Sequence, residues 1–368
     1  MRLILLTAGG RAGSDFFHSL LDGHSQILQF PGALRVDNKL KLILKTKDSK
    51  KKAKLFIKFY PEFFNSKFNK FERWHKLGKK KNRFFKVNNK TFINNFYKLS
   101  LKNEINISNY KCLINLHLAY LMARKKNIQN IKVLFVHTHL LSWTKEFIKL
   151  FEIKTADILH TIRHPLSSLS SPINSWLLYD KGKHFFSKNL FYQINTVVNC
   201  INDISKLGKL HIIKLERLHR ENTSLMKNFC KKFKINYEPS LKRSTKNDLT
   251  WWSDILSKKY KSGISRNFRV KIYENHFYER DLIFFQNLTK KIIKKYKYNF
   301  YYDEKNILFN LLPMKCEIDV WKNTINGLFS GHFRWKHLLS IPIFYILRII
   351  MINKIQIIFK NKNLPKEI

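Results

Sequence analysis

The chain has 368 residues, with 70 lysines and arginines against 25 aspartates and glutamates, and a formal net charge of +45. This length allows one large domain or two, and 44% hydrophobic residues suffice for a sizeable core. The charge favours anionic partners, but lysine, asparagine, isoleucine and phenylalanine, all residues of A/T-rich codons, are abundant together. Without zinc-finger spacing or an aromatic–basic RNA motif, a nucleic-acid role rests on charge alone and is not favoured.

The cysteines argue against a structural metal and against a disulfide framework. They are scattered along the chain without a C-x-x-C pair, at Cys112, Cys200, Cys230 and Cys316. We therefore expect no metal in the protein.

The segment LILLTAGGRAGSDFF, at residues 3–17, predicts a strand, a tight turn and a helix. Leu3–Leu6 is an apolar run typical of a buried strand, and a helix is expected to start near Asp15. Free N–H groups in the first turn of a helix attract phosphate, and glycines let the main chain approach it closely. Arg11 lies inside this loop, where its guanidinium would reach the same anion.

An ordinary strand-to-helix connection would also need glycines, so the loop alone leaves both interpretations open. A nucleotide kinase loop has the form G-x-x-x-x-G-K-[S/T], in which the lysine reaches the outer phosphates. In this chain Gly9 and Gly13 are too close together for that form, and no lysine precedes Ser14. The loop therefore predicts an anion site without the usual equipment for a metal–triphosphate.

A second segment, residues 156–176, follows the same plan. The apolar run Ile158–Ile162 indicates a strand, and His164-Pro165 a turn. Arg163 would lie at the strand end and Ser171 on the following helix, eight residues later. Both side chains could meet one phosphate.

With these two motifs in order, the chain resembles the sulfotransferase family, whose donor is 3′-phosphoadenosine 5′-phosphosulfate. GGRAGSDFF is similar to the family's 5′-phosphosulfate loop, and Arg163-His164-Pro165 with Ser171 is similar to its 3′-phosphate motif, R-[D/N]-P followed by a serine. His164 replaces the usual acid or amide. The resemblance implies that the donor is bound by Gly10, Arg11, Ala12, Gly13, Ser14, Asp15, Arg163 and Ser171.

Later segments extend the resemblance over most of residues 1–300. HIIKLERLH at 211–219 is similar to a strand that carries a family glutamate, and 244–252 and 279–296 are similar to late family features. The implied fold is α/β, a P-loop-like three-layer fold with a central parallel β-sheet. We expect a catalytic domain over residues 1–300.

The segment KVLFVHTHLLSW, at 132–143, predicts a strand with His137 and His139 at its carboxyl end. In open parallel sheets this edge is where ligands bind. HTHL resembles the K-T-H-L of one sulfotransferase branch, which implies that His139 is the catalytic base, with His137 in the place of the lysine. A structural histidine is the alternative interpretation. Asp15 is the rival base, although capping or orienting is the role we expect for it.

Residues 39–110 predict a helical insertion. Its phenylalanines recur at spacings of three and four, which is typical of amphipathic helices packed on a core. In the family, insertions here help to bind the acceptor. Trp74 could stack on a sugar, but packing in the core is the expectation we favour.

Residues 301–368 predict a C-terminal helical extension. The stretch 338–360 is strongly apolar but begins with a proline-broken turn and contains Arg348 and Lys354. An uninterrupted membrane span needs about 20 apolar residues, so we expect residues 336–362 to lie on an anionic membrane surface. Packing on the catalytic domain or on a second copy is an equal alternative. The flanking charges are Arg334, Lys336, Lys360 and Lys362.

The sequence as a whole predicts a sulfotransferase that moves a sulfuryl group to a hydroxyl or amine, in which His139 and Arg11 act in catalysis. We expect a cell-envelope glycan or glycolipid as acceptor, as in polysaccharide sulfation, and a cytoplasmic protein held peripherally on the inner face of the cell membrane. Two alternatives stay open: a basic membrane- or nucleic-acid-binding protein without catalysis, and a nucleotide-dependent phosphoryl transferase. The oligomeric state is not encoded in any pattern we find.

Overall fold

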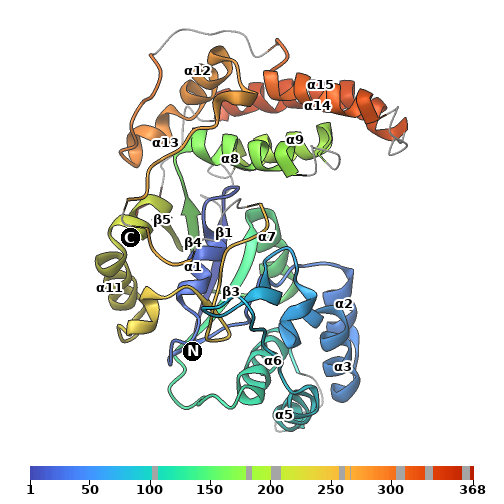
Figure 1. Ribbon diagram of the computed structural model, residues 1–368. Helices are drawn as coiled ribbons and strands as arrows, with labels where there is room; N and C mark the ends of the chain where they lie inside the picture. The colour runs from blue at the N-terminus through green and yellow to red at the C-terminus, as the bar shows by residue number, and fades with distance from the viewer. Residues whose placement is uncertain are drawn as a thin grey trace.

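The protein is described from a computed structural model. The structure describes residues 1–101, 107–179, 185–199, 209–256, 262–265, 267–303, 311–327, 335–358 and 365–368. Its centre is a five-stranded sheet in the order β2-β3-β1-β4-β5, in which every neighbouring pair is parallel (Figure 1). The strands are β1 (Arg2–Ala8), β2 (Ile27–Leu28), β3 (Val133–Leu140), β4 (Asp157–Ile162) and β5 (Lys209–Lys214). A separate hairpin pairs β6 (Thr245–Lys246) with β7 (Leu249–Thr250).

Helices cover the sheet and extend beyond it. Those in the first half of the chain are α1 (Ser14–Leu20), α2 (Asn38–Lys45), α3 (Ser49–Phe59), α4 (Pro61–Phe64), α5 (Asn89–Leu101), α6 (Asn109–Ala123), α7 (Leu141–Leu150) and α8 (Pro165–Leu178). Those in the second half are α9 (Ser187–Asn199), α10 (Leu215–Arg220), α11 (Asn222–Phe233), α12 (Glu279–Leu288), α13 (Lys290–Lys295), α14 (Lys315–Asn326) and α15 (Trp335–Ile358).

Strand β1 is buried on both faces, as parallel strands between helix layers are. Leu3 and Leu5 pack in a cluster with α2, α3, α5, α6 and α7. Ile4 and Leu6 point the other way, into a cluster with α1 and α11. The alternation places helices on both faces of the sheet, so the predicted α/β fold with a central parallel sheet is confirmed.

The region predicted as a helical insertion contains α2 to α5 and the first residues of α6. Trp74 is 2% exposed and belongs to the main core cluster, which confirms that it packs in the core. Phe56 and Phe63 are buried with it. The division of the chain at residue 300 stays a prediction.

The last long helix packs across the top of Figure 1, against α9 and α14. Sequence analysis expected a proline-broken turn at its start, but α15 begins at Trp335 and continues through Pro342. Pro342 lies on the exposed side of the helix. There, water can satisfy the carbonyl that loses its N–H partner, so the helix continues.

Candidate functional site

The loop after β1 is shaped by two glycines with left-handed backbone angles, Gly10 (φ 72°) and Gly13 (φ 83°). A Cβ on Gly13 would lie 2.4 Å from a methyl group of Leu215, and one on Gly10 would lie 3.2 Å from the Ser168 hydroxyl. Gly13 therefore lets the start of α1 pack closely against α10. This packing role is additional to the anion contact that the sequence suggested.

Several N–H groups of this loop precede the helical hydrogen-bond ladder. The N–H of Ala12 donates to the Gly10 carbonyl at 2.9 Å, and the first N–H bonded inside α1 is that of Phe17, to Gly13. The N–H groups of residues 14–16 therefore lie in the first turn of α1, before the helical hydrogen bonds begin, where they could donate to an anion. Ala12 and Ser14 are buried.

Arg11 is paired with a carboxylate from a distant segment. Its Nη1 lies 3.0 Å from Asp254 Oδ2, and its Nη2 donates to Oδ1 at 3.2 Å. Asp254 follows the β6–β7 hairpin, so this hairpin determines what faces the loop. An incoming anion would have to exchange with Asp254 for the Arg11 guanidinium.

Arg163, directly after β4, lies beside this loop. Together with Gly9 and Ser168 it lines a pocket between the loop and α8. Its Nε is buried and has no hydrogen-bond partner in the described part of the chain. Burial lowers the pKa of Arg163, and Glu216 opposes that shift. A buried guanidinium N–H without an acceptor is suited to an oxyanion.

The serine in this pocket is not the one the sequence indicated. Ser168 lines it and donates a hydrogen bond of 2.7 Å to the Gly9 carbonyl, which ties α8 to the first loop. Ser171, nearly one turn further along α8, is half-buried and does not line this pocket. A role for Ser171 in phosphate binding stays a prediction.

His164, the departure from the family motif, is a packing residue. Its ring lies edge-on to Tyr298, and its Nε2 lies 3.0 Å from the Asn299 carbonyl. Burial lowers its pKa to about 4, so the ring is neutral near pH 7. The backbone N–H of His164 donates to Glu216 at 2.9 Å, which fixes the turn that carries Arg163.

Three titratable side chains meet between the carboxyl end of β3 and the first turn of α1. Asp15 carboxylate oxygens lie 3.6 Å from His137 Nδ1 and 3.9 Å from His139 Nδ1. The register of β3 against β1 shifts between Leu6 and Thr7, so Thr138 is an extra residue there. His139 has a left-handed φ of 67°, a conformation that a residue other than glycine rarely adopts and that concentrates at functional sites.

The charges in this cluster are coupled. Burial is the main effect on both histidines and lowers their pKa values, that of His137 to about 3, while Asp15 opposes the shift. Burial also disfavours the Asp15 carboxylate, but the positive groups around it outweigh burial and lower its pKa, namely His137 and His139 when they are protonated, with Lys246 and Arg11. Near neutral pH the arrangement is an ionised carboxylate beside two neutral imidazoles. His137 is buried, whereas the His139 side chain is 35% exposed and accessible.

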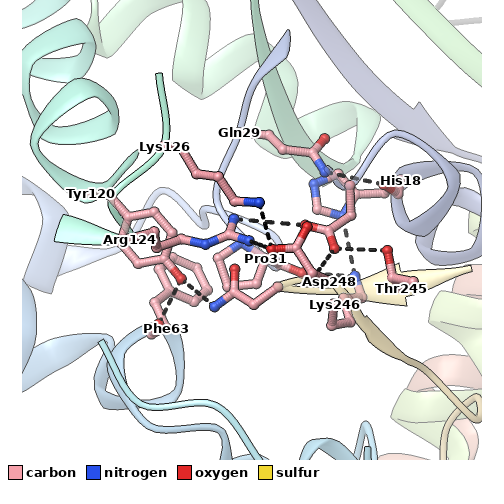
Figure 2. A network of polar contacts seen from close by, with 12 residues as sticks. His18, Gln29, Pro31, Phe63, Tyr120, Arg124, Lys126, Thr245, Lys246 and Asp248 are labelled. Carbon is pink, nitrogen blue, oxygen red and sulfur yellow. Dashed lines mark hydrogen bonds and ion pairs between the residues drawn. The ribbon is translucent and has the colours of Figure 1, made fainter. Parts of the chain in front are cut away.

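Sequence analysis did not identify Lys246, which lies under this cluster. Its buried Nζ donates to the Pro31 carbonyl at 2.7 Å and lies 3.1 Å from His18 Nδ1 (Figure 2). Burial lowers its pKa, and Asp15 is the largest opposing influence. The ammonium also faces the ring of Trp251 at 5.2 Å. Lys246 therefore brings a buried positive charge from β6 to this cluster, where it contacts His18 and is influenced by Asp15.

Figure 2 also shows how the hairpin that carries Lys246 is held in place. Asp248 pairs with Arg124 at 2.9 Å and with Lys126 at 2.8 Å, and Thr245 donates to Asp22 at 2.8 Å. These contacts fix the hairpin between α6 and the end of α1. They thereby position Lys246 and the residues that lead to Asp254.

Glu72, from the predicted insertion, is a second residue that the sequence did not single out. Burial raises its pKa to about 8, and the charges of Asp15 and Asp254 add to the effect. Perturbed carboxyl groups of this kind concentrate at functional sites. The only available signal was its place between aromatic residues in the insertion.

Asp15, His137 and His139 also form a potential set of metal ligands. One ligand atom from each lies within 4.8 Å of the others, a grouping found among the described residues only here. The neighbouring positive charges of Lys246 and Arg11, which act on Asp15, oppose a divalent cation at this point. The same charges favour an anion.

No family model matches the chain, and no curated protein matches it. Among solved structures, it is similar to a sulfotransferase domain from the Synechococcus PCC 7002 olefin synthase, with 13% identity and a TM-score of 0.41 over 82% of this chain and 96% of that one. A sulfotransferase domain from the curacin biosynthetic pathway is similar with 14% identity and a TM-score of 0.38, over 81% of this chain and 99% of that one. The sulfotransferase STF9 from Mycobacterium avium is similar with 13% identity and a TM-score of 0.38, over 81% of this chain and 77% of that one. Similarities this weak do not establish an activity, so the function rests on the site residues.

Proposed function

We propose that the chain transfers a sulfuryl group from 3′-phosphoadenosine 5′-phosphosulfate to a hydroxyl or amine of an acceptor. The observation that carries the proposal is the pocket in which Gly9 lies beside Arg163. The Arg163 Nε has no acceptor among the described residues, and a buried donor left unpaired costs about 1–3 kcal/mol. An anion would remove that cost. Two anion motifs in contact support a donor that carries phosphate groups on both sides of one nucleoside.

In this proposal the two motifs divide the donor between them. Arg163 and Ser171 bind the 3′-phosphate, which selects this donor over ATP. Arg11, the backbone of residues 12–15 through the N–H groups of residues 14 and 15, and the Ser14 hydroxyl bind the 5′-phosphosulfate. Because Arg11 is held by Asp254 in the structure, donor binding is an exchange in which phosphosulfate replaces this carboxylate.

The chemical step is an in-line displacement at sulfur. The acceptor oxygen or nitrogen forms a bond to sulfur as the bond from sulfur to the bridging oxygen breaks, and 3′-phosphoadenosine 5′-phosphate leaves. His139 removes the acceptor proton, and its lowered pKa supports this role because the imidazole is unprotonated near neutral pH. Asp15 stabilises the imidazolium that forms, and Arg11 neutralises charge on the bridging oxygen.

For the acceptor we propose a glycan or glycolipid of the cell envelope. Trp143 supports this choice, because its half-buried ring lies 5.9 Å from that of His139, where a sugar could pack on it. The guanidinium of Arg35 lies 5.2 Å from the same ring and offers donors for hydroxyl or anionic groups of such an acceptor. The enzyme would act in the cytoplasm, on the inner face of the cell membrane.

Calorimetry with 3′-phosphoadenosine 5′-phosphate and with ADP, each with magnesium or with a chelator, tests the proposal. We expect the first nucleotide to bind more tightly by about tenfold or more, because only its 3′-phosphate reaches Arg163. The Arg163→Gln variant should lose that preference, while Arg243→Gln, an exposed control, should keep it. Equal binding of both nucleotides would contradict the proposal. Tighter ADP binding with magnesium would support a phosphoryl transferase instead.

A further inference from the structure

Between Trp335 and Ile350 the outer face of α15 is apolar apart from Lys336 at its start. Six large side chains there are between 40% and 70% exposed, namely Trp335, Leu339, Ile343, Ile346, Leu347 and Ile350. At about 100° per residue these positions fall within an arc of about 120°. We name these six residues the outer stripe. Exposed apolar side chains occur singly on most proteins, but a continuous row of them indicates a binding surface.

The opposite face of α15 is fixed to the rest of the molecule. Met351 and Ile352 are buried in the cluster that includes α9 and α14. Arg348, only 1% exposed, donates to both carboxylate oxygens of Glu317 on α14, at 3.1 and 3.0 Å. The charge in the middle of the helix therefore points away from the outer stripe and is neutralised inside the protein.

The segment before α14 is bound to α15 on the side opposite the outer stripe. The Leu312 carbonyl accepts a hydrogen bond from Arg348 at 3.2 Å, and the Leu311 carbonyl accepts one from the Tyr345 hydroxyl. Both leucine side chains are nevertheless exposed, Leu311 by 62% and Leu312 by 43%. The segment is thus fastened to α15 by its backbone and leaves its apolar side chains in solvent.

We propose that the outer stripe docks on an anionic membrane surface, with α15 lying parallel to that surface. By length and composition alone, the window Trp335–Ile352 would suffice to cross a membrane. Crossing would, however, separate Arg348 from Glu317 and remove α15 from α9 and α14, whereas lying on the surface keeps these contacts. An interfacial helix with Trp335 and exposed Lys336 at one end matches this arrangement.

The charge of the chain decides between lipid and a second copy as the occupant of the stripe. Two molecules that each carry a formal charge of +45 repel one another, whereas an anionic leaflet attracts them. Of the flanking charges expected from the sequence, Arg334, Lys360 and Lys362 lie outside the described residues. The attraction therefore rests on Lys336 and on the charge of the whole molecule.

The docking does not depend on the proposed sulfuryl transfer, but it would have a consequence for that reaction. Val197 of α9 lines the pocket with Gly9 and Arg163, and α15 packs on α9. A membrane on the outer stripe would then be separated from the donor pocket by two helices, α15 and α9. That arrangement suits an acceptor carried by a lipid.

Sedimentation of the full-length protein with phosphatidylcholine vesicles, with and without phosphatidylglycerol, tests the inference. The stripe variant is Leu339→Glu, Ile343→Glu and Ile346→Glu together. The matched control places the same three charges on other exposed apolar residues, as Leu42→Glu, Phe68→Glu and Leu101→Glu. We expect the wild type and the control to sediment with anionic vesicles at about 0.15 M salt, and the partition coefficient of the stripe variant to fall about tenfold or more.

Three results would overturn the inference. One is equal sedimentation of the stripe variant and the wild type, which would mean that charge alone binds the vesicles. Another is wild-type protein that stays in the supernatant. The third is a wild-type protein that is a dimer in light scattering while the stripe variant is a monomer, which would assign the stripe to a second copy.

Thermal unfolding monitored by circular dichroism checks that the variants fold. If the triple variant does not fold, Leu339→Glu alone replaces it. Nucleotide calorimetry on the same proteins tests the proposed function separately, so failure of membrane docking can be distinguished from failure of donor binding.

Discussion

The carboxyl edge of the sheet and the outer stripe of α15 depart from the usual distribution of polarity in opposite ways. At the sheet edge, the buried Nε of Arg163 and both ring nitrogens of His137 make no hydrogen bond to any described residue. On α15, large apolar side chains are exposed. Folding favours neither arrangement. Unpaired buried polar groups fit a polar ligand and exposed apolar groups fit a lipid surface, so each departure indicates what the region binds.

The largest expected effect concerns the sheet edge. The His139→Ala variant should lower donor turnover by about 10²–10⁴-fold, because a positioned general base contributes a factor of that size. Donor affinity should not change, since His139 is proposed to contact the acceptor. Release of 3′-phosphoadenosine 5′-phosphate measures the rate. His276→Ala is the matched control, because His276 also pairs with a carboxylate, Asp319, at 2.8 Å, but outside the site. Full turnover in His139→Ala would remove this histidine from catalysis and leave Asp15 or Glu72 as the base.

A smaller effect tests whether the loop is shaped by packing as well as by its ligand. Gly13→Ala should lower the free energy of unfolding by about 2–4 kcal/mol, from its left-handed backbone and the clash with Leu215. Gly327→Ala is the control, because a Cβ there meets nothing within 4 Å and its φ is −62°. Urea unfolding without nucleotide measures both. Equal stability of the two variants would mean that the loop tolerates a side chain and that its glycines serve the ligand alone.

The smallest effect is on the pH profile. Burial lowers the pKa of His139 and Asp15 raises it, so we expect the acid limb of donor turnover to lie below pH 6.5. Asp15→Asn removes the raising charge and should move this limb to lower pH, whereas Asp319→Asn should not move it. A limb that stays in place or moves to higher pH in Asp15→Asn would contradict the coupling of Asp15 to His139.

The sequence predicted the sheet because its central strands are buried on both faces and are therefore largely apolar, as in Leu3–Leu6 and in Ile158–Ile162, which His160 and Thr161 interrupt. It also placed Arg163 and His139 at the carboxyl ends of their strands, because the residue at which an apolar run ends marks the end of the strand. The partners of these residues could not be predicted. Arg11 meets Asp254 and His18 meets Lys246 across more than 200 residues, and no local pattern encodes such pairs.

Local geometry limited the predictions in other places. The extra residue Thr138 in β3, which helps to bring His137 and His139 to Asp15, has no sequence signature. The choice between Ser168 and Ser171 depends on how α8 is rotated against the loop. On α15, the sequence showed an apolar helix with an arginine in it, but only packing against α14 showed that Arg348 points inward.

A crystal structure with 3′-phosphoadenosine 5′-phosphate bound tests the central claim most directly. We expect the 3′-phosphate within hydrogen-bond distance of the Arg163 guanidinium. We expect the 5′-phosphate against the backbone of residues 12–15, at the N–H groups of residues 14 and 15, with Arg11 released from Asp254. A nucleotide that leaves Arg163 unoccupied, or that binds away from the first loop, would contradict the account.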